Sequence, residues 1–438
     1  MLYRFSVENF RSFKDLNELS FIPQANTDKH VADGDTHIPV LRSAVIYGPN
    51  ASGKSNIIKA MAFARGFILD NTRLAKSNNE SFRMNNDGNK TPSVFTFQIK
   101  IENQLYEYGF AVSFKKLEVV EEWLKICTPD DDVDIFTREW DEDIQHCHIV
   151  FNTGKQNGNA KRYETYKEDL ESASGELVLS SLAAKKFSGD HFKDIIDAVY
   201  RWFVKLIILF PNTTINLIGE MAKNKEAVNK LYKQYYSLFD IDIDEIQLNR
   251  LNGGYVDLPD ELKAQLKTDL TRDADGQYCI LHGGNRDYLV KLDDNSELEF
   301  SEIKFLHKTD DGDVAFGMEN ESDGTMRLFD IIPVLGKILS EDRVLVVDEI
   351  DRSLHCILTR KMMEHFYQKS ENRRSQLICT THDVVLLDRS PITNQEIWFV
   401  DKKARRSSLY PLSSYQLVGD ENDIIRKYLI GRFSAIPQ

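Results

Sequence analysis

Residues 41–55 read LRSAVIYGPNASGKS, an apolar run followed by a glycine-rich turn with the pattern G-x-x-x-x-G-K-S from Gly48 to Ser55. The run up to Tyr47 is typical of a buried strand, and residues 55–69 place apolar side chains near one face of a helix. Glycine suits this junction because backbone N–H groups can then turn inward around an anion without a Cβ in the way. The stretch predicts a phosphate-binding loop between a strand and a helix, with a plain glycine turn as the alternative.

Two residues of this loop have side chains with a specific chemistry. Lys54 is predicted to pair with the β- and γ-phosphates of a nucleotide, and the Ser55 hydroxyl to ligate Mg²⁺. ATP and Mg²⁺ are therefore the expected cofactors. The predicted nucleotide-binding residues are Gly48, Pro49, Asn50, Ala51, Ser52, Gly53, Lys54, Ser55 and Asn56.

Two further apolar runs end in polar side chains. Residues 344–349 read VLVVDE, and residues 376–383 read QLICTTHD. Ligands of open α/β sheets lie at the carboxyl edge of the strands, so these tips are expected near the loop. Asp348 is predicted to hold Mg²⁺, Glu349 to act as general base on the attacking water, and His382 to hydrogen-bond the γ-phosphate. Taken singly, either run is also consistent with an ordinary buried strand that ends in a solvated side chain.

Together these motifs resemble Walker A, Walker B and the histidine switch of the ABC-type ATPase heads in SMC, RecF and OLD-type proteins. The segment ESDGTMR, residues 321–327, is similar to the signature of that branch. The resemblance implies that Ser322, Gly324 and Thr325 address the γ-phosphate bound by the opposite subunit. In DRSLH, residues 351–355, it places His355 in the D-loop. The implied fold class is α/β, an ABC ATPase head with a mixed sheet, an antiparallel β meander near the N-terminal lobe and a mainly helical insertion.

The two ends of the chain, about residues 1–125 and 300–438, resemble the RloA- and AbiL-like AAA family ATPases of bacterial abortive-infection and anti-phage systems. The resemblance rests on FSVENFRSFKD, VVDEIDRSLH, CTTHDVVLLD and YLIGRFSAIP. It implies an ATP-hydrolysing, nucleotide-switched sensor or scaffold that forms a homodimer through composite ATP sites, or a larger even-numbered oligomer. It also implies a separately encoded effector, a nuclease or toxin.

A RecF-like DNA repair or recombination ATPase that clamps DNA is the alternative function, and it leaves nucleic acid open as a partner. A self-contained OLD-type nuclease is disfavoured, because residues 383–438 carry no second cluster of strand-end carboxylates. The net charge of −14 argues against a broad, non-specific grip on nucleic acid. The basic run around Lys402 and Arg405 is predicted to lie in a hairpin turn as solvated charge.

The composition, 42% hydrophobic and 28% charged, is that of a soluble globular protein. No run approaches the roughly 20 apolar residues of a membrane span, so a cytoplasmic protein without membrane contact is expected. The five cysteines include no CxxC pair, which indicates neither a zinc site nor a disulfide framework. Adjacent residues of a strand point to opposite faces, so His146, Cys147 and His148 are not expected to share a metal.

Three regions are predicted. Residues 1–150 form an N-terminal ATPase lobe with the loop and a meander, residues 151–280 a mainly helical insertion or lid, and residues 281–438 a C-terminal ATPase lobe. Within the insertion, residues 190–210 and 226–241 have helical patterns. In the family a glutamine senses Mg²⁺. Gln98 and a polar residue in the segment 209–212 are the two candidates for this role, which stays unassigned. Asn9, Arg11 and Ser12 resemble the family's N-terminal element near the nucleotide, with a surface charge as the alternative for Arg11.

Overall fold

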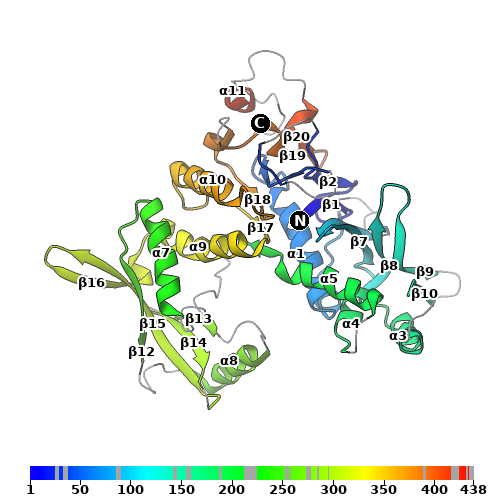
Figure 1. Cartoon of the computed structure of the whole chain (residues 1–438), viewed down its shortest axis with the longest axis horizontal. Coiled ribbons are helices and arrows are strands. Elements are labelled where there is room, and N and C mark those ends of the chain that lie inside the picture. The colour runs from blue at the N-terminus through cyan, green and yellow to red at the C-terminus, as the bar shows by residue number, and fades with distance from the viewer. Residues whose placement is uncertain are drawn as a thin grey trace. The chain divides into compact units, whose positions relative to one another are not determined.

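The computed structural model describes residues 1–24, 29–32, 38–84, 90–141, 146–153, 159–186, 190–211, 224–251, 256, 258–272, 278–283, 286–293, 295–387, 391–415, 424–430 and 433. The chain divides into two compact units (Figure 1). The first unit comprises residues 1–210, 341–350 and 367–438, and the second unit residues 211–340 and 351–366. The α/β fold class, with a mixed sheet and an antiparallel meander near the N-terminus, is confirmed.

An antiparallel seven-stranded sheet of the first unit has the strand order β10-β9-β8-β7-β6-β1-β2. Buried and more exposed residues alternate along most of these strands, as expected for a sheet with one packed face. In the edge strand β10, Cys147 is buried while His146 and His148 are exposed, so the histidines and the cysteine do point to opposite faces. The strands are β1 (Leu2–Glu8), β2 (Asn17–Ser20), β6 (Ser93–Ile101), β7 (Gln104–Ser113), β8 (Glu118–Cys127), β9 (Val133–Asp141) and β10 (His146–Phe151).

The second sheet of the first unit has the strand order β11-β17-β18-β5-β19-β20, parallel except for the final hairpin. Strands β5, β17 and β18 are buried along their whole length, which explains their uninterrupted apolar sequences. Because they are parallel, their carboxyl ends meet at one edge. The strands are β5 (Ser43–Tyr47), β11 (Ile207–Leu209), β17 (Val344–Val347), β18 (Gln376–Thr380), β19 (Ile397–Lys403) and β20 (Arg406–Pro411).

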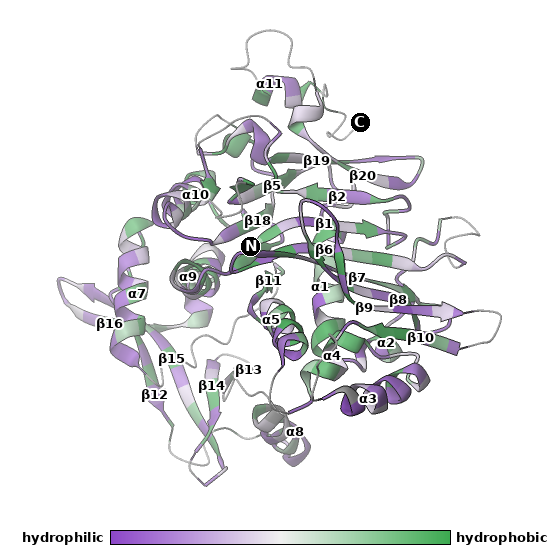
Figure 2. Cartoon of the chain, turned by 45° about the vertical axis from the view of Figure 1, so that its right-hand side comes forward, coloured by the Kyte–Doolittle hydropathy of each residue, from purple (hydrophilic) through white to green (hydrophobic). Residues whose placement is uncertain are grey.

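Helices α1, α2, α3, α4 and α5 of the first unit contribute to one hydrophobic core with these sheets. Figure 2 shows the contrast between the mainly hydrophobic strand β5 and the mainly hydrophilic helix α3. Asp190 begins α5 as an N-cap, since its carboxylate accepts from the Lys193 backbone N–H at 2.9 Å. The helices are α1 (Lys54–Leu69), α2 (Arg73–Lys76), α3 (Ala160–Ser172), α4 (Val178–Ala183), α5 (His191–Lys205) and α11 (Ile424–Leu429).

The single helical pattern predicted over residues 190–210 is wrong at its end. Helix α5 stops at Lys205, and Ile207–Leu209 forms strand β11 in parallel register with β17. A short apolar run has no periodicity that separates helix from strand. These residues form a strand because the edge of β17, which is far away in the sequence, offers their backbone groups hydrogen-bond partners.

The second unit contains an antiparallel sheet of order β12-β15-β14-β13, with β16 paired to the far end of β15. Tyr232 of α7 stacks on Phe329 of α9 and donates a 2.9 Å hydrogen bond to its carbonyl. The elements are α7 (Lys225–Leu238), β12 (Glu245–Arg250), α8 (Asp260–Arg272), β13 (Tyr278–Gly283), β14 (Arg286–Leu292), β15 (Leu298–Thr309), β16 (Gly312–Gly317) and α9 (Asp323–Glu341). Helix α10 (Cys356–Ser370) begins in this unit. In the described part of the chain, no helix combines the length and apolarity that crossing a membrane requires.

Candidate functional site

The glycine-rich loop lies where predicted, between the carboxyl end of β5 and the start of α1. Gly53 adopts a φ of 118°, a conformation that side chains with a Cβ rarely take. A Cβ there would also overlap the Ser407 hydroxyl and lie 2.8 Å from Ser12 Oγ. At Gly48 a Cβ would overlap the Val400 carbonyl oxygen. Both pattern glycines are therefore required by the local packing of the loop.

The Lys54 side chain is buried and folds back over the loop. Its Nζ donates to the carbonyl oxygens of Gly48, at 2.6 Å, and Pro49, at 3.1 Å. These contacts hold a compact positive charge beside the inward-turned loop and the start of α1. A positive charge next to a helix N-terminus is a favourable environment for a phosphate group.

The two predicted Mg²⁺ ligands are direct neighbours. Ser55 Oγ donates to Asp348 Oδ1 at 3.1 Å, and Asp348 is buried at the end of β17. Mg²⁺ holds oxygen ligands at about 2.0–2.1 Å in an octahedron, so adjacent ligands lie about 2.9 Å apart. The hydroxyl and the carboxylate therefore fit two adjacent positions around this ion. Among the described residues, no cluster of three or more His, Cys, Asp or Glu side chains is arranged to hold a metal.

A buried threonine links the two acidic residues. Thr380, at the end of β18, donates to Asp348 Oδ1 at 2.6 Å and accepts from the Glu349 backbone N–H at 2.8 Å. Glu349 itself has a φ of 51°, the left-handed conformation that non-glycine residues seldom adopt. The strand-end hydroxyl thus holds both the buried carboxylate and the unusual backbone that presents Glu349.

One cavity of about 360 Å³ collects residues from all three predicted motifs. Glu349 and His382 line it opposite the loop, and His382 is exposed just beyond the end of β18. The predicted loop residues that line it are Pro49, Asn50, Ala51, Gly53, Lys54, Ser55 and Asn56. Ser52 is buried beneath the loop. The cavity has the size of a small-ligand pocket and joins a cation, a part-buried carboxylate and an imidazole.

Three further residues at this site, Lys59, Lys402 and Ser407, have no predicted role there in the sequence. Lys59 and Lys402 also line the cavity, and Lys402 Nζ donates to the Ala51 carbonyl at 3.4 Å. Ser407 and Ser12 are hydrogen-bonded to each other at 2.8 Å under the loop, where Ser12 also accepts from the Asn56 amide. The prediction that Lys402 is only solvated charge in a hairpin is therefore incomplete. The hairpin exists, but pairing of β19 with β5 brings its base to the loop.

The signature residues lie in the second unit, at the start of α9. Ser322 caps this helix, since its Oγ accepts from the Thr325 backbone N–H at 3.1 Å and lies 2.9 Å from the Thr325 hydroxyl. A Cβ at Gly324 would lie 2.8 Å from the Ser353 carbonyl oxygen, so glycine permits this close approach. An open pocket of about 500 Å³ is lined by Ser322, Gly324, Thr325 and Ser353.

His355 follows the left-handed residue Ser353 and begins α10. It is exposed, and its Nδ1 accepts from the Ile357 backbone N–H at 3.3 Å. The predicted D-loop histidine is thus a helix cap with its ring at the surface of the second unit.

The candidates for the sensing glutamine and for the N-terminal element are placed as follows. Gln98 lies in β6 and donates to Glu107 of β7 at 2.9 Å, within the antiparallel sheet. Asn212, the polar residue of the alternative segment, lies outside the described residues. The Arg11 guanidinium is paired with Glu80 at 2.8 Å, and the Asn9 amide donates to the Thr91 carbonyl at 2.7 Å. Of the N-terminal element, Ser12 is the residue that contacts the loop helix.

Two solved structures are similar to this chain over most of its length. The SMC head domain from Thermotoga maritima is 14% identical, with a TM-score of 0.36 over 94% of this chain and 98% of that chain. The SMC head bound to the C-terminal winged-helix domain of ScpA is 12% identical, with a TM-score of 0.38 over 93% and 96%. No curated protein matches the chain.

The sequence model of one family covers both Walker-type motifs and the signature segment. Its description reads "AAA domain, putative AbiEii toxin, Type IV TA system", and it matches residues 43–388. The match confirms the predicted resemblance to ATPases of the AAA type. The chain belongs to this AbiEii-type family of AAA domains.

Proposed function

We propose that this protein is an ATPase that pairs head to head with a second copy and encloses ATP between the two chains. The observation that carries the proposal is the cavity of the first unit, which joins Lys54, Glu349 and His382. Ser322 and Gly324 lie instead around an open pocket in the second unit. We infer that these two residues of one copy complete the cavity of the other, as the signature does in the resembling branch.

Each residue in the cavity then has a defined task. Lys54 binds the β- and γ-phosphates, while Ser55 and Asp348 hold Mg²⁺, which would neutralise charge on the phosphates. Glu349 takes a proton from the attacking water, and His382 orients this water and the γ-phosphate. The Ser322 hydroxyl and the N-terminus of α9 contribute hydrogen-bond donors from the partner subunit.

ATP would act as a reversible link between the copies. The interface binds well only while the γ-phosphate is held by both chains, so hydrolysis lowers the affinity of one copy for the other. This differential affinity of the two nucleotide states is what a switch requires. Larger even-numbered assemblies are compatible with the same pairing.

For the biological role, we propose a sensor or scaffold subunit of an anti-phage, abortive-infection system that controls a separately encoded effector. The description of the family, with its putative AbiEii toxin, supports the link to such systems, and the resemblance of the two chain ends supports the sensor or scaffold role. A RecF-like clamp on DNA is the alternative. The net charge of −14 and the engagement of Lys402 at the loop leave less positive charge for gripping DNA.

Mixing two inactive variants tests whether the site is shared between copies. Lys54→Ala removes the loop cation of one copy, and Ser322→Arg blocks the signature of another. In a mixed dimer, one site keeps an intact loop from the Ser322→Arg chain and an intact signature from the Lys54→Ala chain. Each mixed dimer should therefore have up to about half of the wild-type activity, since one of its two sites is intact, and a one-to-one mixture, in which about half of the dimers are mixed, up to about a quarter.

A matched control uses two changes in the same half of the site. A mixture of Lys54→Ala with Glu349→Gln leaves no complete site in any dimer and should stay inactive. The mass of Glu349→Gln in solution should rise with ATP and Mg²⁺, because the unhydrolysed nucleotide holds the copies together. If the first mixture stays as inactive as the control, the shared site is wrong.

The role of the ATP-bound form is tested separately. Glu349→Gln with ATP should co-purify with a protein encoded beside it and show no preference for duplex DNA in fluorescence anisotropy. Tight, ATP-dependent binding of duplex DNA without a protein partner would favour the clamp instead.

A further inference from the structure

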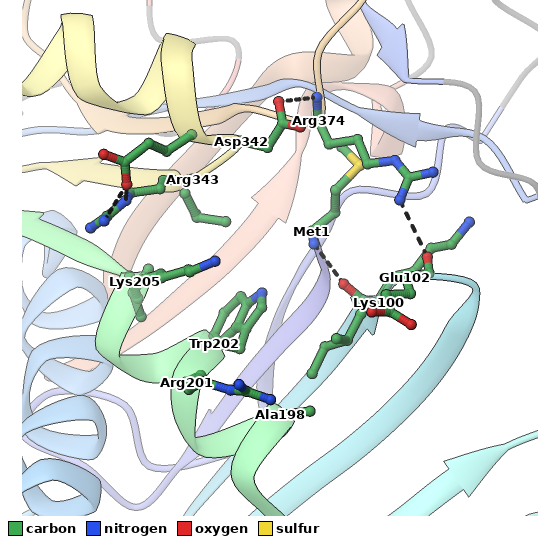
Figure 3. A pocket seen from close by; sticks show the side chains of 14 residues that line it. Met1, Lys100, Glu102, Ala198, Arg201, Trp202, Lys205, Asp342, Arg343 and Arg374 are labelled. Carbon is green, nitrogen blue, oxygen red and sulfur yellow. Dashed lines mark hydrogen bonds and ion pairs between the residues drawn. The ribbon is translucent and has the colours of Figure 1, made fainter. Parts of the chain in front are cut away.

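A second cavity of the first unit, of about 510 Å³, lies at the opposite ends of the strands that carry the candidate site (Figure 3). Arg343 and Arg374 precede β17 and β18, whose carboxyl ends lead to Glu349 and His382. The last turns of α5 and the end of β6 complete the wall. The volume is within the range of about 300–1,000 Å³ that is usual for small-molecule sites.

The side chains around this cavity carry a surplus of positive charge. The cations are Lys100, Arg201, Lys205, Arg343 and Arg374, and the carboxylates are Glu102, Glu341 and Asp342. Glu341 is engaged with Arg343, at 2.7 Å from its Nε. Figure 3 shows Arg343 and Lys205 on one side of Met1 and Trp202, and Arg374 and Lys100 on the other. Such a concentration of cations on a chain of net charge −14 creates a local field that attracts anions.

Two of these cations, Arg201 and Lys205, have exposed side chains. Arg201 and Lys205 make no ion pair within the described part of the chain, and Arg201 Nε donates only to the Asp197 carbonyl at 3.1 Å. A helix C-terminus explains one or two cations by its dipole. The helix dipole does not explain why Arg343, Arg374 and Lys100, which belong to other elements, also line this cavity.

An aromatic ring lies among these cations. Trp202 of α5 is half-buried, and edge-to-face contacts with Phe203, at 5.0 Å, and Phe97, at 6.3 Å, hold its indole in place. Figure 3 shows the indole between Lys205 and Arg201. A fixed ring surface that remains partly open can stack on a flat base, and this contact combines well with cations that bind phosphate.

We propose that this cavity binds a nucleoside phosphate at a site separate from the glycine-rich loop. The base stacks on Trp202, and the phosphate is held by Arg201 and Lys205. A walled cavity of this volume accommodates one nucleotide, whereas a strand of nucleic acid needs a continuous groove. The inference goes beyond the proposed ATPase function and does not depend on it.

The test is calorimetric titration of the full-length Lys54→Ala protein, in which binding at the loop is impaired. The probes are AMP, GMP and inorganic pyrophosphate. The charge-reversal variant Arg201→Glu/Lys205→Glu, made in the Lys54→Ala background, should weaken binding of all three probes at least tenfold. The matched control is Lys161→Glu/Arg162→Glu on α3, which makes the same change in net charge at two exposed helical residues and should leave binding unchanged.

Trp202→Leu separates stacking from charge. It should weaken AMP and GMP about tenfold, in line with the usual contribution of base stacking, and leave pyrophosphate unaffected. The proposal is overturned if none of the probes binds, or if the two charge-reversal variants weaken binding equally. It is also overturned if a twelve-nucleotide single strand binds at Arg201 and Lys205 and AMP does not displace it, which would indicate a nucleic-acid surface.

Discussion

Replacing Thr380 by valine should damage the candidate site without changing its shape. Thr380 is fully buried, donates to Asp348 at 2.6 Å and accepts from the Glu349 N–H at 2.8 Å. Hydrogen bonds to charged groups contribute about 1.5–3 kcal/mol, and a buried donor left without a partner costs about 1–3 kcal/mol. The extra methyl contact of valine offsets about 1 kcal/mol. We expect a net loss of about 2–4 kcal/mol.

Two assays follow this substitution. In thermal unfolding, the midpoint should fall by about 4–8 °C, given roughly 2 °C per kcal/mol for units above 200 residues. In steady-state ATP hydrolysis, kcat should fall about 10- to 100-fold, because Glu349 loses the contact that positions its backbone. Thr380→Ser keeps the hydroxyl and should retain most of the activity, with a loss of about 1 kcal/mol for the missing methyl.

Thr359 provides a matched control for the valine change. It is also fully buried, but its Oγ1 has no hydrogen-bond partner in the described part of the protein. Thr359→Val should therefore leave stability unchanged or raise it slightly, since burying a hydroxyl without a partner is unfavourable. The reasoning is refuted if Thr380→Val and Thr380→Ser have equal midpoints and equal kcat.

Two further predictions concern the loop and the cysteines. Gly53→Ala should weaken ATP binding at least tenfold in a nucleotide titration, because the φ of 118° and the Ser407 hydroxyl leave no room for a Cβ. An unchanged affinity would contradict this packing. In alkylation at pH 8 followed by peptide mass spectrometry, Cys356 at the start of α10 should react before Cys127, since burial raises the pKa of the Cys127 thiol to about 12 and keeps it protonated. Raising the pH towards 12 should increase labelling of Cys127, whereas rapid labelling at pH 8 would contradict the raised pKa of this half-buried thiol.

Much of the candidate site could be predicted because its chemistry is local in the sequence. The loop at Gly48–Ser55 sits between β5 and α1, and the acidic pair and His382 follow β17 and β18 directly. Parallel strands place such tips at one edge whatever the rest of the fold does. Ser322 and Gly324 at the start of α9, and His355 before α10, lie in the second unit.

The residues that were missed depend on contacts between segments far apart in the chain. Ser407 and Lys402 reach the loop through strand pairing and packing, and Thr380 reaches Asp348 and Glu349 through the pairing of β18 with β17. The hairpin that contains Lys402 was predicted from the sequence, but its position beside the loop was not predicted.

The sequence alone determined the glycine-rich loop between a strand and a helix, the strand-end carboxylates and the α/β class, because hydrophobic periodicity and glycine placement act over a few residues. Only the tertiary structure decided that Ile207–Leu209 is a strand, that Thr380 bridges Asp348 and Glu349, and that five cations surround a cavity with Trp202. The pairing of β11 with β17 and the cavity join segments more than a hundred residues apart, and Thr380 lies 32 residues from Asp348 along the chain. Such pairing depends on which edges and faces remain open after the whole chain has packed.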